Sequence, residues 1–362
     1  MAISTTLKTA LVAAVAVLAG FAGYAGRAAD VPSTGPLLAP PVAHTGTELQ
    51  VLTYNVHGLP WPVASSRAAQ LAAIGERLAA LHRLGRAPQV GVIQEAFTAD
   101  ARAIARQSGY RYAAYGPGED AAFAAPLPRG AQPATLDRGA HWWKGEGIGK
   151  WEGSGLILLS DYPITRVHRL SYSSQACAGF DCLAAKGAML ARLTLPGGRE
   201  VDVANTHLNS RRASGVAYDR ANRAWLVQTE ELRGFIAANR DPAVPLVLGG
   251  DFNVGHDLVR EQGMADFASR LGRSTSDGLR DLARAGFAMP RDAAVEMAHA
   301  KDWQLTLNAP QVRLAAQSVW VPFGPAQRTE LSDHYGYVVR YALRDTGRDT
   351  GRDAVVRHPA LR

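Results

Sequence analysis

Several sequence motifs that define large enzyme classes are absent from this chain of 362 residues. It has no HExxH pair for a catalytic zinc ion, no GxSxG turn for a serine nucleophile and no Walker A loop for a nucleotide phosphate. The glycines of GEGIGKWEGSG (145–155) lack the spacing of a dinucleotide-binding turn and do not open a helix, so we interpret this segment as a loop. These four enzyme classes are therefore without support.

A large excess of either charge is also lacking. Lys and Arg number 39 against 32 Asp and Glu, which gives a net charge of +7. This mild excess fits attraction to a phosphate-bearing partner, either nucleic acid or a lipid surface, but it forms no polybasic stripe.

The N-terminal segment, residues 1–30, has the composition of an export signal. Lys8 precedes an uncharged run rich in Ala, Val and Leu, and small residues follow before Asp30. We expect a signal peptide or an N-terminal anchor and favour the cleaved signal, because Gly and Ala make the run a marginal membrane span. The rest of the chain is then predicted to be secreted or periplasmic, or anchored and facing outside.

Cysteine is nearly absent, since Cys177 and Cys182 are the only two, and they do not form a CxxC pair. Two cysteines without that spacing count against a structural zinc site. Export permits a disulfide, and two cysteines have one obvious pairing, so we predict a Cys177–Cys182 bond. So short a loop removes little entropy from the unfolded chain, and its main value would be local rigidity.

Composition divides the remainder of the chain into three parts. Residues 31–47 are rich in Pro and are expected to form a leader, and residues 344–362 repeat Arg, Asp, Thr and Gly and are expected to be a disordered tail. No break in composition divides residues 48–343, so we expect one domain there and a monomeric protein.

Within that domain, short apolar segments rich in β-branched residues alternate with helical stretches. Strands are expected at 49–57, 89–97, 153–160, 187–195, 199–208, 244–254 and 334–343. Helices are expected at 65–84, 98–109 and 218–239, with Thr98 as an N-cap and Gly109 as a stop for the second. The interleaving predicts an α/β or α+β fold.

Polar side chains repeatedly stand where these strands end or begin. They are Asn55 and His57, Glu95, Asn205, His207 and Asn209, Asp251 and Asn253, and Asp333 with His334. Any one of them could be a polar strand end that enters a loop, but the repetition favours a shared site. Carboxylates and amides suit a hard cation such as Mg²⁺ or Mn²⁺, and imidazoles suit acid–base chemistry and phosphate binding.

The segments TYNVHGLP, QEAF, GSGLILLSDYPI, THLNS, GGDFNV and LSDH occur in the order and context of the endonuclease/exonuclease/phosphatase superfamily. The chain resembles this family over about residues 48–343 and is most similar to its neutral-sphingomyelinase branch. YNVxGLP and a central Asp-x4-Lys-Gly loop are typical of that branch, and Asp181 and Lys186 have this spacing. The resemblance implies a DNase I-like, four-layer sandwich of two packed β-sheets flanked by helices, and Mg²⁺-dependent cleavage of phosphoester bonds.

The resemblance also implies a role for each matching residue. Glu95 would be the principal metal ligand, with Asn55 nearby and Asp333 beside the metal, which would be Mg²⁺, Mn²⁺ or another divalent cation. Asp251 would orient or deprotonate the attacking water, Asn253 would donate to the phosphoryl oxygens, His207 would bind the phosphate or assist the leaving group, and His334 would be the main acid–base imidazole.

Two further elements carry over less directly. An imidazole of this kind needs a carboxylate partner, and Asp333 points away from His334 if both lie on a strand. The resemblance therefore makes Asp302 in AKDWQLTL the partner, although Gln304 replaces the aliphatic residue that is usual there. Lys186 would reach toward the phosphate, guided by Asp181. The alternative for Asp181 and Lys186 is an exposed ion pair on a strand-entry loop.

For the activity, the sequence favours a secreted phosphodiesterase of the sphingomyelinase, or phospholipase C, type. A secreted endonuclease is the alternative, with NSRRASG (209–215), Arg220 and Arg223 as a possible DNA-binding face or simply a solvated loop. An inositol-phosphate phosphatase and an inactive binding module are weaker alternatives.

Three tryptophans bear on a lipid partner. Trp142, Trp143 and Trp151 lie beside two lysines, a composition that resembles a patch for a phospholipid membrane surface. Packing beneath a loop is the alternative.

Overall fold

The computed structural model describes residues 34–36, 46–60, 63–121, 139–327 and 331–346. The predicted signal peptide lies outside the described residues, as do most of the predicted leader and residues 347–362 of the predicted tail. Among the helices in the described ranges, none is long and apolar enough to cross a membrane.

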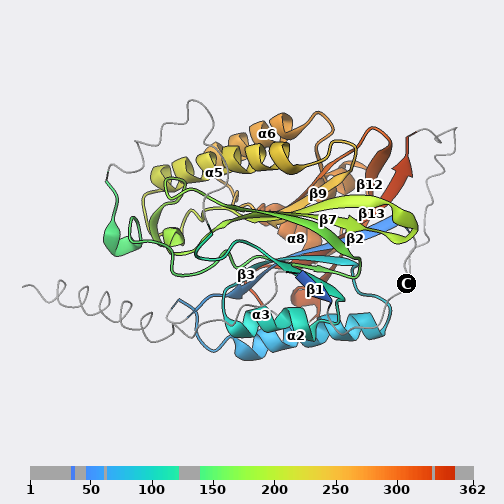
Figure 1. Ribbon diagram of the computed structural model, residues 1–362, viewed down its shortest axis with the longest axis horizontal. Coiled ribbons are helices and arrows are strands. Elements are labelled where there is room, and N and C mark those ends of the chain that lie inside the picture. The colour runs from blue at the N-terminus through green and yellow to red at the C-terminus, as the bar shows by residue number, and fades with distance from the viewer. Residues whose placement is uncertain (1–33, 37–45, 61–62, 122–138, 328–330, 347–362) are drawn as a thin grey trace, which may run out of the picture.

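Two β-sheets pack face to face, and helices cover the outer face of each (Figure 1). The first sheet has the strand order β1 (Thr34–Pro36), β4 (Tyr112–Tyr115), β5 (Ile157–Ser160), β3 (Val90–Ala96), β2 (Glu48–Gly58), β13 (Gly336–Asp345) and β12 (Val312–Phe323). The second has the order β10 (Ser276–Asp277), β11 (Asp302–Leu307), β9 (Leu246–Asp251), β8 (Glu200–His207), β7 (Gly187–Thr194) and β6 (Ile164–Ser171). The predicted four-layer sandwich is confirmed.

The helices form the two outer layers. Helices α2 (Ala68–Arg83) and α3 (Ala99–Gln107) lie on the first sheet, and α5 (Tyr218–Asn239) and α6 (Leu258–Leu271) lie on the second (Figure 1). Helices α7 (Gly278–Arg284) and α8 (Arg291–His299) contact both β11 and β12. Short 3₁₀ turns are found at Trp142–Lys144, Gly179–Leu183, Pro196–Gly198 and Pro325–Gln327. The predicted N-cap of α3 is confirmed, because the Thr98 side chain accepts a hydrogen bond from the Ala101 backbone N–H.

Each expected strand and helix is found, with ends shifted by a few residues, and the first sheet extends beyond residues 48–343 at both ends. Strand β13 continues to Asp345, because Arg344 and Asp345 pair with β12, so the predicted tail cannot begin at residue 344. Strand β1 lies inside the predicted leader and pairs with β4. Backbone pairing with a neighbouring strand decides both cases, and composition does not report such pairing.

Apolar side chains fill the space between the sheets, but a few buried polar groups cross it. Asn205 on β8 donates through Nδ2 to the backbone oxygens of Ile93 (2.8 Å) and Ile157 (3.0 Å) on the opposite sheet. Its Oδ1 accepts a hydrogen bond of 2.7 Å from Gln94 Nε2. Gln304 on β11 likewise donates to the Val51 oxygen at 3.0 Å. These bonds fix how the two sheets lie against each other, since a shifted sheet would leave buried polar atoms unpaired.

We predict that Asn205→Leu lowers the free energy of unfolding by about 3 kcal/mol, because it removes one hydrogen bond from the buried Gln94 amide and one from each of two buried carbonyls. Urea unfolding followed by circular dichroism measures the change. Asn239→Ala is the control, since Asn239 bonds only within its own helix, to the Phe235 oxygen, and its cost should stay within about 0.5 kcal/mol. Equal losses for the two variants would contradict this account of the sheet interface.

Candidate active site

Four strands deliver polar side chains to one end of the sandwich. Strands β2 and β3 are parallel neighbours in one sheet, and β8 and β9 are parallel neighbours in the other. The carboxyl ends of each pair therefore meet at the same edge. Asn55 and Glu95 lie there in the first sheet, and His207 and Asp251 are register partners in the second.

The backbone is bent where three of these strands end. His57, Glu95 and Asn253 have φ values of 52°, 58° and 52°, in the left-handed region that non-glycine residues rarely adopt. Such conformations cost of order 1–3 kcal/mol each and cluster at functional sites. Asn and His are enriched in this region, whereas Glu is not, so nothing in the sequence signalled the conformation of Glu95.

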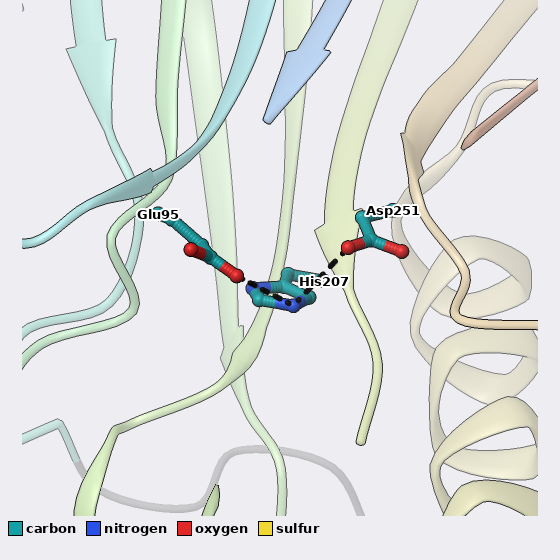
Figure 2. Close-up of side chains that lie close together, drawn as sticks. All are labelled: Glu95, His207 and Asp251. Carbon is teal, nitrogen blue, oxygen red and sulfur yellow. Dashed lines mark ion pairs between the residues drawn. The ribbon is translucent and has the colours of Figure 1, made fainter. Parts of the chain in front are cut away.

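Figure 2 shows His207 between two carboxylates, Glu95 and Asp251. His207 Nε2 lies 3.9 Å from Glu95 Oε1 and 3.6 Å from Asp251 Oδ2. Asp251 is buried, its Oδ2 accepts a hydrogen bond from Asn55 Nδ2 (3.0 Å), and its Oδ1 accepts one from the Asn253 backbone N–H (2.9 Å). The Asp251 carboxylate of the second sheet is thus hydrogen-bonded to Asn55 of the first sheet.

The two carboxylates of this cluster have opposite pKa shifts. Burial raises the pKa of Glu95 to about 7, against the lowering effect of Asn55. Burial alone would also raise the pKa of Asp251, but the neighbouring His334, His207 and Lys186 outweigh it and lower that pKa. Asp251 is therefore ionised at neutral pH, whereas the Glu95 carboxyl group is only partly ionised there.

The carboxylate oxygens of Glu95 and Asp251 fit a hard divalent cation. Glu95, His207 and Asp251 have ligand atoms within 4.8 Å of one another. A cation beside Glu95 would offset the cost of burying its charge. Asn55 Oδ1 instead accepts a hydrogen bond from the His57 N–H (3.0 Å), and the half-exposed Asp333 lies 3.4 Å from His57 Nδ1. The metal roles of Asn55 and Asp333 remain predictions.

A second cluster lies next to the first and contains a short hydrogen bond. His334 Nδ1 lies 2.5 Å from Asp302 Oδ2, and Nε2 lies 3.8 Å from Asp251 Oδ2. Asp302 on β11 is the register partner of Asp251 on β9, which brings the two carboxylates to either side of the imidazole. Burial alone would lower the pKa of His334, but Asp302 and Asp251 raise it to about 10. The imidazole is thereby stabilised as a cation.

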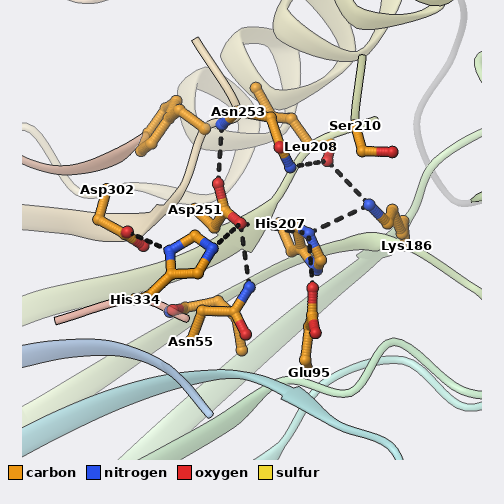
Figure 3. A network of polar contacts seen from close by, with 12 residues as sticks. Asn55, Glu95, Lys186, His207, Leu208, Ser210, Asp251, Asn253, Asp302 and His334 are labelled. Carbon is orange, nitrogen blue, oxygen red and sulfur yellow. Dashed lines mark hydrogen bonds and ion pairs between the residues drawn. The ribbon is translucent and has the colours of Figure 1, made fainter. Parts of the chain in front are cut away.

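Lys186 and Asp181 form a buried pair that faces His207, as Figure 3 shows in part. Lys186 Nζ lies 3.1 Å from Asp181 Oδ2, 3.1 Å from His207 Nε2 and 3.0 Å from the Leu208 oxygen, to which it donates. Asp181 also accepts a hydrogen bond from the Ser210 N–H. The two side chains keep only 7% and 13% of their surface exposed, so the alternative of an exposed ion pair is wrong.

Burial and the Lys186 ammonium together determine the state of His207. Burial and this neighbouring charge lower the pKa of His207 to about 3, so the imidazole is neutral at ordinary pH. Its Nε2 is then the acceptor for Lys186, which leaves the proton on Nδ1. With Nε2 already engaged, His207 is less suited to a cation than the oxygens of Glu95 and Asp251.

The predicted disulfide is confirmed, with a Cα–Cα distance of 5.2 Å between Cys177 and Cys182. The closed loop exposes the Phe180 side chain to solvent by 46% and directs Asp181 inward to Lys186. The bond therefore constrains the loop that presents the Asp181–Lys186 pair.

A buried cation that no sequence motif includes lies behind the site. Arg260 on α6 is fully buried, and its Nη1 donates to the backbone oxygens of Asn209 (2.8 Å) and Asn253 (2.6 Å). It thus ties together the loops that follow β8 and β9. Asn253 Nδ2 is bonded to the Leu208 oxygen at 2.9 Å, which holds the same two loops from the other side. An Arg in the first turn of a polar helix gives no sequence signal of such burial.

The tryptophans differ in exposure. Trp142 and Trp143 are 63% and 54% exposed, so for these two the alternative of packing beneath a loop is wrong, whereas Trp151 is half-buried. Their turn is supported by the buried Glu146, which accepts hydrogen bonds from the His141 N–H (2.6 Å), the Gly179 N–H (2.8 Å) and Arg220 Nε (2.7 Å). This carboxylate connects the tryptophan turn, the disulfide loop and the start of α5.

Comparisons with known proteins agree with this architecture. The sequence model of the Endonuclease/Exonuclease/phosphatase family matches residues 52–334. Sphingomyelinases of Mycobacterium bovis and Mycobacterium tuberculosis are 28% identical over 209 residues, which cover 57% of this chain and 34% of each relative. The match therefore spans about a third of the length of these curated relatives.

Solved structures are similar in fold. SmcL (TM-score 0.51, 15% identity) and sphingomyelinase C from Streptomyces griseocarneus (0.51, 20%) each align over 82% of this chain and 99% of their own. Beta toxin from Staphylococcus aureus with bound magnesium ions (0.50, 17%) aligns over 82% of this chain and 100% of its own. At these identities the likeness shows the fold alone.

The raised pKa of His334 predicts a pH-dependent stability. The folded pKa of about 10 exceeds the ordinary value of 6.5, so the folded protein binds this proton more tightly than the unfolded chain. The stabilisation is complete below pH 6.5 and is lost as the pH rises to 10, by at most about 1.4 kcal/mol per pH unit. We expect the unfolding free energy in EDTA to fall more steeply over this window for the wild type than for His334→Gln. Parallel curves would contradict the pairing with Asp302.

Proposed function

Because this chain belongs to the endonuclease/exonuclease/phosphatase family, we propose that it is a phosphodiesterase of the sphingomyelinase type. It hydrolyses sphingomyelin or a related phospholipid by in-line attack of water, releasing the phosphorylated head group. The observation that carries the proposal is the meeting of Glu95, His207 and Asp251 with the Asp302–His334 pair at one end of the sandwich. The partial match to curated sphingomyelinases supports the choice of substrate.

The oxygens of Glu95 and Asp251 would hold a divalent cation, Mg²⁺ or alternatively Mn²⁺. When bound, such a cation supplies positive charge to the phosphoryl oxygens and to the leaving oxygen. The protein supplies the remaining groups. Asn253, whose Nδ2 bonds to the Leu208 oxygen, stands beside the cluster as a donor to the phosphoryl oxygens once a substrate displaces that bond. Lys186 adds a positive charge 3.1 Å from His207.

Proton transfer falls to Asp251 and His334. Asp251 is ionised and buried, so it can orient the attacking water and accept its proton. His334 carries a proton on the Nε2 that faces Asp251, and Asp302 holds its Nδ1. It can therefore donate a proton to the oxygen that leaves. His207 is neutral and contributes as a binding group rather than as the acid.

The endonuclease alternative loses some support from the state of three of its four arginines. Arg220 is buried and paired with Glu146, Arg223 is paired with Asp219, and Arg211 is paired with Asp257, whereas Arg212 is exposed. A DNA-binding face needs cations that are free to neutralise phosphates. The inositol-phosphate phosphatase and the inactive binding module have no specific observation in their favour.

We predict that Glu95→Gln, Asp251→Asn and His334→Ala each lower turnover at least about 100-fold without unfolding the protein. Exposed Glu76→Gln is the control and should keep wild-type activity. The assay uses vesicles of sphingomyelin, vesicles of phosphatidylcholine and plasmid DNA, each with Mg²⁺ and with EDTA. Phosphocholine release from sphingomyelin that EDTA abolishes supports the proposal.

Nicking of plasmid DNA without lipid hydrolysis would favour the endonuclease instead. Activity on none of the substrates with Mg²⁺ or Mn²⁺ would favour an inactive binding module. Near wild-type turnover in two of the three site variants would refute the residue roles.

A lipid surface is the partner that the exposed aromatic residues support. Trp142, Trp143, Phe180 and Tyr218 are between 46% and 63% exposed. Their segments are joined through Glu146, which bonds to His141, Gly179 and Arg220, and through the Phe180 N–H, which donates to the Ser214 oxygen. Rigid, exposed aromatic side chains suit the boundary between head groups and acyl chains. The disulfide supports a location outside the cytoplasm, secreted or periplasmic, and we propose that the protein acts as a monomer.

Replacing both Trp142 and Trp143 by Ser should lower activity on sphingomyelin vesicles at least about tenfold, because the loss removes more than about 1.4 kcal/mol of apolar binding. Hydrolysis of soluble bis(4-nitrophenyl) phosphate should not change. Leu84→Ser, at a 67% exposed residue that follows α2 on the first sheet, is the control. Vesicle co-sedimentation measures binding directly, and unchanged binding by the double variant would rule out this surface.

A further inference from the structure

A second buried carboxyl group lies behind the Asp302–His334 pair. Glu296 is on α8, with 1% of its surface exposed, and its Oε2 accepts a hydrogen bond from the Tyr335 N–H at 3.3 Å. Tyr335 directly follows His334, so Glu296 also contacts the backbone beside the imidazole. None of the sequence motifs includes Glu296.

Two buried oxygen atoms in this region have no donor if both carboxyl groups are ionised. They are Glu296 Oε1 and Asp302 Oδ1, and neither accepts a hydrogen bond from a donor among the described residues. A buried polar atom without a partner costs about 1–3 kcal/mol, and a charged one costs more. Two neighbouring buried carboxylates would also repel each other.

One proton removes both problems. A protonated carboxyl group has an O–H that can donate, whereas a carboxylate can only accept. The side chains of Glu296 and Asp302 are within hydrogen-bonding contact. A proton shared between them pairs the two oxygens with each other and removes one of the two buried charges.

The surroundings decide which residue holds the proton. Asp302 Oδ2 is 2.5 Å from His334 Nδ1, and this contact stabilises the ionised form of Asp302. Glu296 has no comparable donor, since its backbone contact is long and the half-exposed His299 lies 3.9 Å away. Burial, and then the charge of Asp302, raise the pKa of Glu296 to about 9. The proton therefore resides on Glu296 at neutral pH.

We propose that Glu296 is a positioning residue, whose protonated carboxyl group donates a hydrogen bond to Asp302 and so fixes the carboxylate that orients His334. Asp302 then has two partners, the protonated Glu296 carboxyl group and the His334 imidazole. A carboxylate with only one partner could rotate about its Cβ–Cγ bond and release the imidazole. The effect on catalysis rests on the proposed function, whereas the protonation of Glu296 does not.

Infrared difference spectroscopy tests the proton directly. The wild-type protein minus Glu296→Gln, both at pH 7 in EDTA, should show the C=O stretching band of a protonated carboxylic acid, shifted in D₂O. Glu95 and the other acids are common to both proteins and cancel in the difference. A difference spectrum that contains carboxylate bands only would overturn the proposal, whether or not the protein is an active phosphodiesterase.

Turnover then tests the positioning role. The Gln amide can donate to Asp302 and accept from the Tyr335 N–H, so Glu296→Gln should retain kcat to within about threefold. Leu has a similar size but no donor, and Glu296→Leu should lower kcat about 10- to 100-fold, as is typical when a supporting hydrogen-bond partner is lost. In an Asp302→Ala background, Glu296→Leu should cost no more than about a further twofold.

These outcomes separate the positioning role from others. Equal loss in the Gln and Leu variants, with both folded by circular dichroism, would mean that the negative charge of Glu296 is required, and would overturn the proposal. Full activity of Glu296→Leu would show that Asp302 needs no support. If the wild-type protein hydrolyses no phosphodiester, the proposed function fails, and the infrared experiment alone decides the state of Glu296.

Discussion

A buried carboxylate must be surrounded by hydrogen-bond donors, and the site is organised around this requirement at Asp251. Its partners come from different parts of the chain: Asn55 from β2, the Asn253 backbone from the loop after β9, and two imidazoles from β8 and from the segment before β13. Asn55 belongs to one sheet and Asp251 to the other. The site is therefore complete only when the two sheets pack in one register, which the buried Asn205 and Gln304 enforce.

The same imidazole side chain has two opposite states a few ångströms apart. Beside the Lys186 ammonium, the pKa of His207 falls to about 3, whereas between the Asp302 and Asp251 carboxylates the pKa of His334 rises to about 10. Burial lowers the pKa of both imidazoles; Lys186 lowers that of His207 further, whereas the two carboxylates outweigh burial at His334. The two imidazoles can therefore take different roles: the neutral His207 can bind a substrate oxygen, and the protonated His334 can donate a proton.

The supporting groups around the site follow the same logic. Buried charges such as Arg260 and Glu146 each hold two or more loops, and both are almost fully enclosed. Three strand ends adopt unfavourable positive φ values to aim their side chains. Strain and buried charge both reduce stability, so the apolar core between the sheets and the disulfide have to offset them. These buried polar contacts hold the loops that carry the site residues.

The sequence by itself determined the alternation of strands and helices, the order of the motifs and the residues that stand at strand ends. Apolar periodicity reports local structure, and Asp, Asn, Glu and His after such segments are visible in one dimension. The motifs carried the resemblance that predicted the family and the sandwich fold, and the two cysteines with the export signal predicted the disulfide. The tertiary structure decided what lies beside each group: that Lys186 is buried against His207, that Arg260 and Glu296 support the site, and that residues 344–345 belong to a strand. Protonation states, buried helical charges and strand pairing depend on neighbours that are distant in sequence, so no local pattern could reveal them.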